Sequence, residues 1–275
     1  MIGQLELQKH IEKLLAANRL PRFLMLIGAV GSGRKTVAHW IAQKAGMECV
    51  LVEHNITSIR NAVTQAYDVT MPTMYLIADA NTLSNIAQNT LLKVTEEPPN
   101  SAYFILTVSA TSDVLMTLVN RSYRIILDAY SEQELREYLK QSYGDRSNDY
   151  PIALDICKTM GEIDQLFAYD VNEFMSYVDR VIDNVAVVSG ANSFKIAKGI
   201  SFKEDGSGYD VALFLKAFMI ECLHRMIDDD VLHYAKGIKV TSKYLQDLSI
   251  SGINKAMTFD MWLFDIRKEW LDDSV

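Results

Sequence analysis

The sequence has few cysteines and no long apolar run, and each shortage excludes a class of protein. Its three cysteines lie far apart among 275 residues, at Cys49, Cys157 and Cys222. That spacing fits neither a disulfide framework nor a zinc cluster. A membrane span needs a run of about 18 apolar residues, and none occurs. The amino terminus also lacks the regions of a secretory signal. We therefore predict a cytoplasmic protein without a zinc site or a membrane partner.

Basic residues are also in the minority. Lys and Arg number 27 against 35 Asp and Glu, which gives a formal net charge of −8. Tight binding to the nucleic-acid backbone requires clustered Lys and Arg. The chain alone is therefore a poor candidate for autonomous DNA binding, although it can contribute one or two basic residues to a larger assembly on DNA.

Five short apolar runs in the first half predict the strands of a parallel sheet. Several are almost continuously apolar, as expected where helices cover both faces. They begin at Phe23, Cys49, Met74, Tyr103 and Tyr123. Helical patterns lie between them, at 4–18, 35–45, 58–67 and 84–96. This alternation predicts a doubly wound α/β domain over residues 1–128.

Helical patterns dominate the rest of the chain. They cover residues 131–143, 150–159, 162–169, 210–228 and 257–271. We predict a small helical domain over 129–183 and a third, all-helical domain over 184–275.

The stretch "GAVGSGRKT" from Gly28 to Thr36 nearly spells the phosphate-binding pattern G-x-x-x-x-G-K-[ST]. It follows a strand and opens a helix, so its backbone N–H groups and the helix dipole favour an anion. Arg34 stands where the pattern has Lys, and Lys35 stands where it has the magnesium-binding hydroxyl. Thr36 comes one residue too late, about 100° around the helix. The candidate phosphate-binding residues are Gly28, Gly31, Ser32, Gly33, Arg34, Lys35 and Thr36.

Two interpretations of this loop stay open. Either it binds nucleotide with Arg34 or Lys35 in the role of the lysine, or it is an inherited strand–turn–helix with weak or no binding. A hydrolysing enzyme of this type ends its third strand in Asp followed by Glu. Here "MYLIADAN" places Ala78 and Asp79 at those positions, and Asn81 follows. Because phosphoryl transfer depends on positioning and charge stabilisation, loss of both metal-positioning groups predicts poor hydrolysis.

Two longer stretches resemble the AAA+ clamp-loader subunits. The chain opens with I-G-Q and reaches its glycine loop at the spacing of that family. The stretch "LSNIAQNTLLKVTEEPP" from Leu83 follows the family pattern A-x-N-A-L-L-K-x-L-E-E-P-P more strongly. The matching residues are Asn89, Leu91, Leu92, Lys93, Glu96, Glu97, Pro98 and Pro99. The resemblance implies an α/β AAA+ P-loop domain with a five-stranded parallel sheet, then a helical lid domain and a helical collar domain.

A further match concerns Arg121. The family carries T-I-x-S-R-C where this chain reads "LMTLVNRSYRI", so Arg121 keeps the arginine while Asn120 and Ser122 differ from the flanking residues. The resemblance implies that Arg121 is an arginine finger, which stabilises transition-state charge in a neighbouring subunit's nucleotide site. The alternative is a solvated arginine at the start of a strand.

The combination most resembles the delta-prime type of bacterial DNA polymerase III clamp-loader subunit. It implies a subunit with little or no ATPase activity of its own, which supports sliding-clamp loading in DNA replication. No cofactor is certain, although weakly bound ATP or ADP is an option. The implied partners are other clamp-loader subunits and, through the complex, the sliding clamp and primer–template DNA. The alternative is an autonomous P-loop ATPase that uses Arg34 or Lys35.

The resemblance also implies where DNA and nucleotide would be sensed. Arg60 and the helix start near Gln88 and Asn89 fall on helices that track the DNA backbone, and such contacts position DNA without reading its sequence. Arg60 and Asn89 are our DNA-binding candidates, against the alternative of solvated helix faces. In "MGEIDQL", Asp164 stands near the position of a sensor arginine. Many bacterial members carry a four-cysteine zinc module, but residues 45–74 contain only Cys49.

Overall fold

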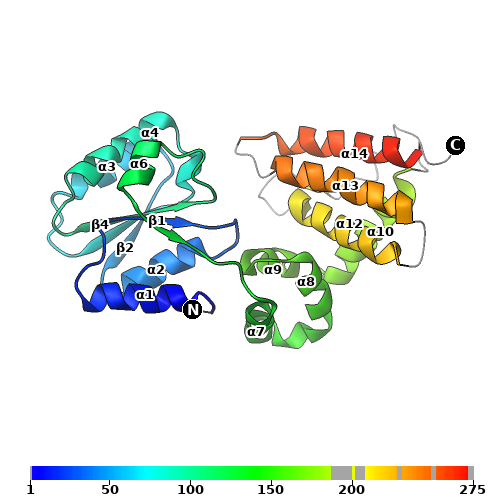
Figure 1. Ribbon diagram of the computed structural model, residues 1–275, viewed down its shortest axis with the longest axis horizontal. Helices are drawn as coiled ribbons and strands as arrows, with labels where there is room; N and C mark the ends of the chain where they lie inside the picture. The colour runs from blue at the N-terminus through cyan, green and yellow to red at the C-terminus, as the bar shows by residue number, and fades with distance from the viewer. Residues whose placement is uncertain (1, 187–199, 202–207, 228–230, 249–251, 272–275) are drawn as a thin grey trace. The chain divides into compact units, whose positions relative to one another are not determined.

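The computed structural model describes residues 2–186, 200–201, 208–227, 231–248 and 252–271 (Figure 1). Two compact units divide the chain. Unit 1 consists of Met1–Tyr138 and Thr159–Gly161, and unit 2 consists of Leu139–Lys158 and Glu162–Val275. The domain boundaries at 128 and 183 stay predictions. No helix in the described part of the chain is long and apolar enough to cross a membrane.

Unit 1 is built on a five-stranded sheet. The strands are β1 (Phe23–Ile27), β2 (Glu48–Val52), β3 (Thr73–Ile77), β4 (Ala102–Val108) and β5 (Tyr123–Ile126). Their order is β2-β3-β4-β1-β5, and every pairing is parallel. The predicted five-stranded parallel sheet is therefore confirmed. β1 lies between β4 and the edge strand β5, and the glycine loop follows the carboxyl end of β1.

Helices cover both faces of this sheet (Figure 1). They are α1 (Leu5–Ala16), α2 (Arg34–Lys44), α3 (Ile56–Gln65), α4 (Asn85–Thr90), α5 (Leu92–Glu96) and α6 (Met116–Arg121), with a short 3-10 turn, η1 (Ala80–Thr82), after β3. The predicted helix over 84–96 is interrupted at Leu91, whose N–H donates to the Gln88 carbonyl three residues back. α6 lies outside the predicted helical patterns.

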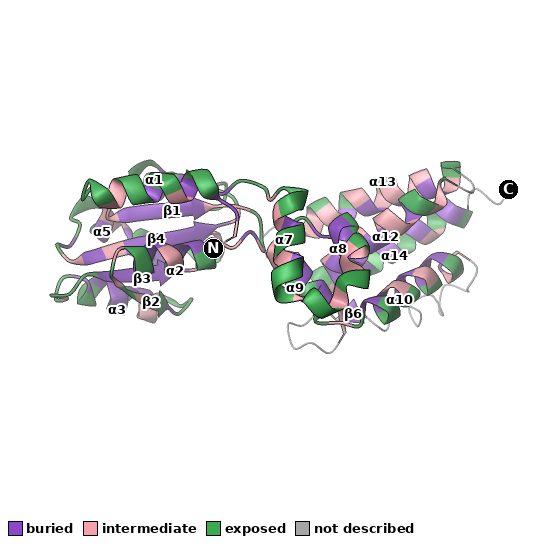
Figure 2. Ribbon diagram, turned by 90° about the horizontal axis from the view of Figure 1, so that it is seen from below, coloured by how far each residue is buried: buried purple, intermediate pink, exposed green. Residues whose placement is uncertain are grey.

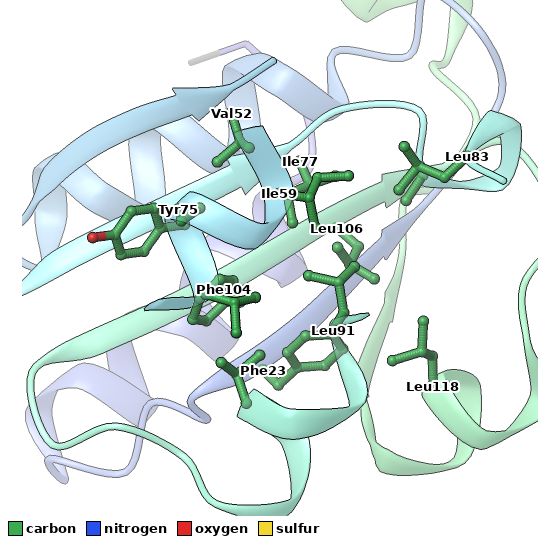
Figure 3. Close-up of a cluster of buried hydrophobic side chains, with 14 of the residues drawn as sticks. Phe23, Val52, Ile59, Tyr75, Ile77, Leu83, Leu91, Phe104, Leu106 and Leu118 are labelled. Atoms are coloured by element: carbon green, nitrogen blue, oxygen red, sulfur yellow. The ribbon is translucent and has the colours of Figure 1, made fainter. Parts of the chain in front are cut away.

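Alternation along the strands produces two cores, because successive strand side chains point to opposite faces. Leu24 and Leu26 of β1 pack with Ile11 of α1 and Ile41 of α2. Phe23 and Met25 face the opposite core, which α3, α6 and the α4–α5 segment cover with residues that include Ile59, Leu118 and Leu91 (Figure 3). Figure 2 shows the result as buried strands between helices with exposed outer sides.

The described residues of unit 2 are helical apart from one short strand pair and the connecting turns. Its helices are α7 (Glu132–Ser142), which begins in unit 1, η2 (Gly144–Asp149), α8 (Tyr150–Ile156), α9 (Met160–Phe167), whose first two residues belong to unit 1, α10 (Val171–Asn184), α12 (Val211–Arg225), α13 (Val231–Leu248) and α14 (Lys255–Leu271). The strands β6 (Ile200–Ser201) and β7 (Tyr209–Asp210) pair in parallel. α10 and α13 lie outside the predicted patterns.

Aromatic side chains fill the core between α12, α13 and α14. Phe218 meets Trp262 edge-on and stacks on Trp270, with ring centroids 5.0 and 5.7 Å apart. Both indole N–H groups are satisfied, since Trp262 donates to Thr241 Oγ1 and Trp270 donates to the His233 carbonyl, each at 3.0 Å. A buried indole normally requires such a partner. Unit 2 therefore has a dense core of its own.

Candidate nucleotide loop and arginine-finger site

The glycine loop connects β1 to α2. Gly31 and Gly33 both have φ of +80°, a left-handed conformation that favours glycine. Gly33 is the N-cap of α2. The Gly161 N–H donates to the Gly31 carbonyl at 3.1 Å, and a Cβ added at Gly161 would lie 2.6 Å from the Gly31 Cα. The glycines are thus required by backbone conformation and by the close approach of residues 159–161.

Arg34 begins α2 and turns inward. Its side chain is only 7% exposed, and its Nη2 donates to Asp79 Oδ1 at 3.0 Å. Burial lowers the pKa of Arg34 from the usual arginine value, and the Asp79 charge raises it in partial opposition. Its other terminal nitrogen, Nη1, is buried and has no hydrogen-bond partner among the described residues. The arginine therefore has a counter-ion and one unsatisfied donor beside a helix amino terminus.

The Asp79 carboxylate lies beside the positive charges of both Arg34 and Lys35. The Lys35 Nζ lies 3.6 Å from Asp79 Oδ2, although the lysine side chain is 57% exposed. Asp79 itself has a left-handed φ of +48°, and its N–H donates to Thr107 Oγ1 at 2.9 Å. The one carboxylate that directly follows β3 is thus used as a counter-ion. Ala78 beside it has no metal-binding group.

The remaining loop residues have mixed surroundings. The Ser32 hydroxyl is buried without a partner among the described residues, and the Ser32 carbonyl accepts a hydrogen bond from the Tyr130 hydroxyl at 2.9 Å. A Cβ at Gly28 would lie 2.7 Å from Ser32 Oγ, so a larger residue there would require the serine side chain to move. Thr36 is exposed on α2. Asn81 accepts a hydrogen bond from the Ser109 N–H at 3.2 Å, which ties the turn after β3 to the end of β4.

Metal-binding side chains do not gather in the described ranges. No group of three or more His, Cys, Asp or Glu residues there could hold a metal ion. Cys157 and Cys222 are buried in unit 2, and burial raises the pKa of each thiol to about 12. Both are therefore protonated near neutral pH, as expected for cysteines that serve packing.

Arg121 is the last residue of α6. Its Nη1 lies 2.9 Å from Glu96 Oε1, and the two side chains are 41% and 54% exposed. Leu118 and Val119 bury the inner side of the helix. The sequence-predicted finger is thus a half-exposed arginine at the end of a helix that packs against the sheet.

Gln88 holds the start of α6, a role that the sequence did not indicate. Its side chain is buried. The amide Nε2 donates to the carbonyls of Leu83 and Asp113 at 3.1 and 3.0 Å, and Oε1 accepts from the Leu115 N–H at 2.7 Å. The expectation that Gln88 faces DNA is therefore wrong. A buried amide with three such bonds links α4 to the segment that leads into α6.

The two DNA-binding candidates are both exposed. Arg60 lies on α3 and Asn89 on α4, and these helices pack against each other in unit 1 (Figure 1). The sensor candidate Asp164 lies in unit 2, where it accepts a hydrogen bond from the Tyr143 hydroxyl at 2.8 Å. An acidic residue there cannot supply the charge of a sensor arginine.

Sequence comparisons find similarity to subunits of DNA polymerase III over part of the chain. A family model described as DNA polymerase III, delta subunit, matches residues 45–131. Two DNA polymerase III gamma subunits of Buchnera aphidicola, from strains Sg and APS, are 24% and 22% identical. The matches cover 54% and 51% of this chain and 50% and 47% of those proteins. The chain thus spans about half the length of the curated relatives. Together these matches support a clamp-loader-type AAA+ protein.

Structural comparisons show the same fold. A DNA polymerase III gamma subunit-related protein of Thermotoga maritima matches with a TM-score of 0.54 and 15% identity, over 94% of this chain and 99% of its own. The RuvB Holliday junction branch migration motor of Thermotoga maritima matches with a TM-score of 0.50 and 14% identity, over 99% and 88%. The predicted α/β fold, with a five-stranded parallel sheet followed by helical carboxyl-terminal parts, is confirmed.

Proposed function

We propose that this protein is a clamp-loader subunit of the delta-prime type, which acts in DNA replication without hydrolysing ATP itself. In this role it supports sliding-clamp loading and supplies Arg121 to the nucleotide site of a neighbouring ATPase subunit. The motif run from Leu83 to Pro99 and the family match over residues 45–131 support the family assignment.

One observation carries the non-catalytic part of the proposal: Asp79 is the counter-ion of both loop cations. Arg34 and Lys35 lie 3.0 and 3.6 Å from its two carboxylate oxygens. Hydrolysis needs a carboxylate that positions magnesium or the attacking water. Ala78 cannot do so, and Asp79 would have to leave Arg34 in a buried site without a counter-ion. These contacts favour a glycine loop that retains the backbone shape of a phosphate-binding loop but does not hydrolyse ATP.

The proposed partners follow from the family and from exposed surfaces. Arg60 and Asn89 would contact the DNA backbone within the complex, in keeping with the low share of basic residues. In unit 2, apolar residues are exposed near the end of α12 and the start of α13, and along α14. Such patches mark protein interaction sites, and we assign these to contacts with other loader subunits. They include Leu223, Ile227, Val231, Leu232, Met257, Met261 and Phe264.

The test is reconstitution with ATPase subunits, the clamp-opening subunit, sliding clamp and primer–template DNA. Arg121→Ala should lower the turnover of the neighbouring site by on the order of 10³-fold, the low end of what an arginine finger contributes. The stimulated ATPase rate of the complex should then fall to that of its other sites. Arg124→Ala is the matched control, because Arg124 is an exposed arginine three residues away on β5. Equal activity of the two variants would contradict the finger role.

A second candidate function is an autonomous P-loop ATPase that uses Arg34 or Lys35. The buried, unpartnered Nη1 of Arg34 beside the α2 amino terminus favours it, because a bound phosphate would satisfy that donor. Steady-state hydrolysis by the isolated chain that Lys35→Ala abolishes would favour this enzyme over the proposed subunit. Binding of ATP or ADP without turnover would agree with the proposed subunit.

A further inference from the structure

The Arg121 guanidinium has a specific neighbour that the arginine-finger pattern does not include. Glu96, the last residue of α5, places its Oε1 2.9 Å from Arg121 Nη1. The two residues end two different short helices and are 25 positions apart in the sequence. Their side chains are about half exposed, so packing does not fix the position of either one.

Both helices that carry this pair are anchored independently. α5 is followed by Pro98, which cannot continue a helix, and the Tyr67 hydroxyl donates to the Glu97 carbonyl at 2.9 Å. Val94 buries the inner side of α5. α6 is held at its start by Gln88 and underneath by Leu118. The carboxylate and the guanidinium therefore meet because their backbones are fixed.

An exposed arginine side chain is otherwise free to sample many rotamers. An ion pair at one terminal nitrogen restricts that freedom and leaves other N–H donors of the guanidinium for a phosphate. Holding a group near its working geometry before the reaction increases the rate of a positioned step. Exposed ion pairs contribute little to folding stability, so the consequence of this contact lies in orientation.

We propose that Glu96 is a positioning residue for Arg121, which orients the guanidinium before it reaches the neighbouring subunit's nucleotide. This inference rests on the proposed arginine-finger function. It gives the first glutamate of "EEPP" a role that the second does not share, because Glu96 is the one that pairs with Arg121.

The experiment compares Glu96→Ala with Glu97→Ala in the reconstituted, DNA- and clamp-stimulated loader. Glu97 is the matched control, because it is the adjacent exposed glutamate and the Tyr67 bond uses only its backbone carbonyl. Glu96→Ala should lower kcat about 5-fold with KM for ATP unchanged, since orientation and not substrate binding is lost. Glu97→Ala should match the unmodified complex.

A double variant separates positioning from a merely structural role. If Glu96 acts through Arg121, then Arg121→Ala combined with Glu96→Ala should have the same rate as Arg121→Ala alone. A further loss in the double variant would overturn the proposal. Thermal unfolding of Glu96→Ala should stay within about 2 °C of the unmodified chain, and a larger shift would likewise count against it.

These outcomes also distinguish the positioning role of Glu96 from the arginine-finger role of Arg121, on which it rests. If Arg121→Ala lowers the rate and Glu96→Ala behaves like Glu97→Ala, Glu96 is not a positioning residue while the finger role stands. If Arg121→Ala leaves the rate unchanged, the finger role is wrong and the positioning role is wrong with it.

Discussion

Two arginine–carboxylate pairs in unit 1 have nearly the same length and very different surroundings. Arg34 lies 3.0 Å from Asp79 and is 7% exposed, whereas Arg121 lies 2.9 Å from Glu96 and is 41% exposed. In the interior a guanidinium loses its hydration, so removing its partner leaves an uncompensated charge. At the surface water replaces the partner. Two ion pairs of nearly equal length therefore differ in accessibility. The Arg34–Asp79 pair is partly buried beside the glycine loop, whereas Arg121 stays accessible to a second molecule.

The largest expected effect comes from breaking the buried pair. Asp79→Ala should destabilise unit 1 by about 2 kcal/mol, below the 3–5 kcal/mol of a fully buried pair because Asp79 is itself 42% exposed. Urea unfolding of the isolated chain measures this free energy. The control is Glu96→Ala, for which we expect less than about 1 kcal/mol. Similar losses in the two variants would mean that burial does not distinguish the pairs.

A smaller effect is expected when the buried charge itself is removed. Arg34→Met deletes the ion pair together with the desolvated guanidinium and its unsatisfied Nη1, so it should cost about 1 kcal/mol, less than Asp79→Ala. The double variant of Arg34→Met and Asp79→Ala should be about as stable as Arg34→Met alone. Additive losses in urea unfolding would show that Asp79 acts through contacts other than Arg34.

The smallest expected effect is the salt dependence of the coupling free energy within each ion pair. The coupling free energy between Glu96 and Arg121, from a double-mutant cycle on unfolding, should be about 0.5 kcal/mol at low salt. It should fall towards zero near 1 M salt, where the Debye length is about 3 Å. The coupling between Arg34 and Asp79 should change less, because the buried side of that pair excludes ions. The same salt dependence for both pairs would remove the contrast between them.

Much of unit 1 could be predicted from the sequence because its signals are local. Strands such as Thr73–Ile77 are continuous apolar runs, and the helix after Gly33 begins where the glycine loop ends. The break at Leu91 could not be predicted, because the helical pattern continues across it. The interruption is a backbone hydrogen bond from the Leu91 N–H to the Gln88 carbonyl three residues back. α6 has only six residues, too few for a helical period to be recognised.

The candidate site was also predicted only in part from the sequence. Residue types and spacing singled out Arg34, Lys35, Asp79 and Arg121, since phosphate loops and arginine fingers have defined patterns. The sequence did not indicate which residues pair with these groups, because Asp79 lies 45 positions from Arg34 and Glu96 and Arg121 lie on different helices. Gln88 was assigned to a surface because its burial depends on the segment from Asp113 to Leu115 that folds against it.

Residue type and spacing alone settle which chemical groups this protein has at its glycine loop and at the end of α6. The same signals locate the five strands of the sheet, because each strand is a short apolar run, but they do not locate α6, α10 or α13. What those groups contact depends on how the chain folds in three dimensions. Folding buries Arg34 against Asp79 and leaves Arg121 half exposed beside Glu96. Desolvation and ion pairing depend on which distant segments the sheet brings together, and no local sequence pattern encodes those contacts.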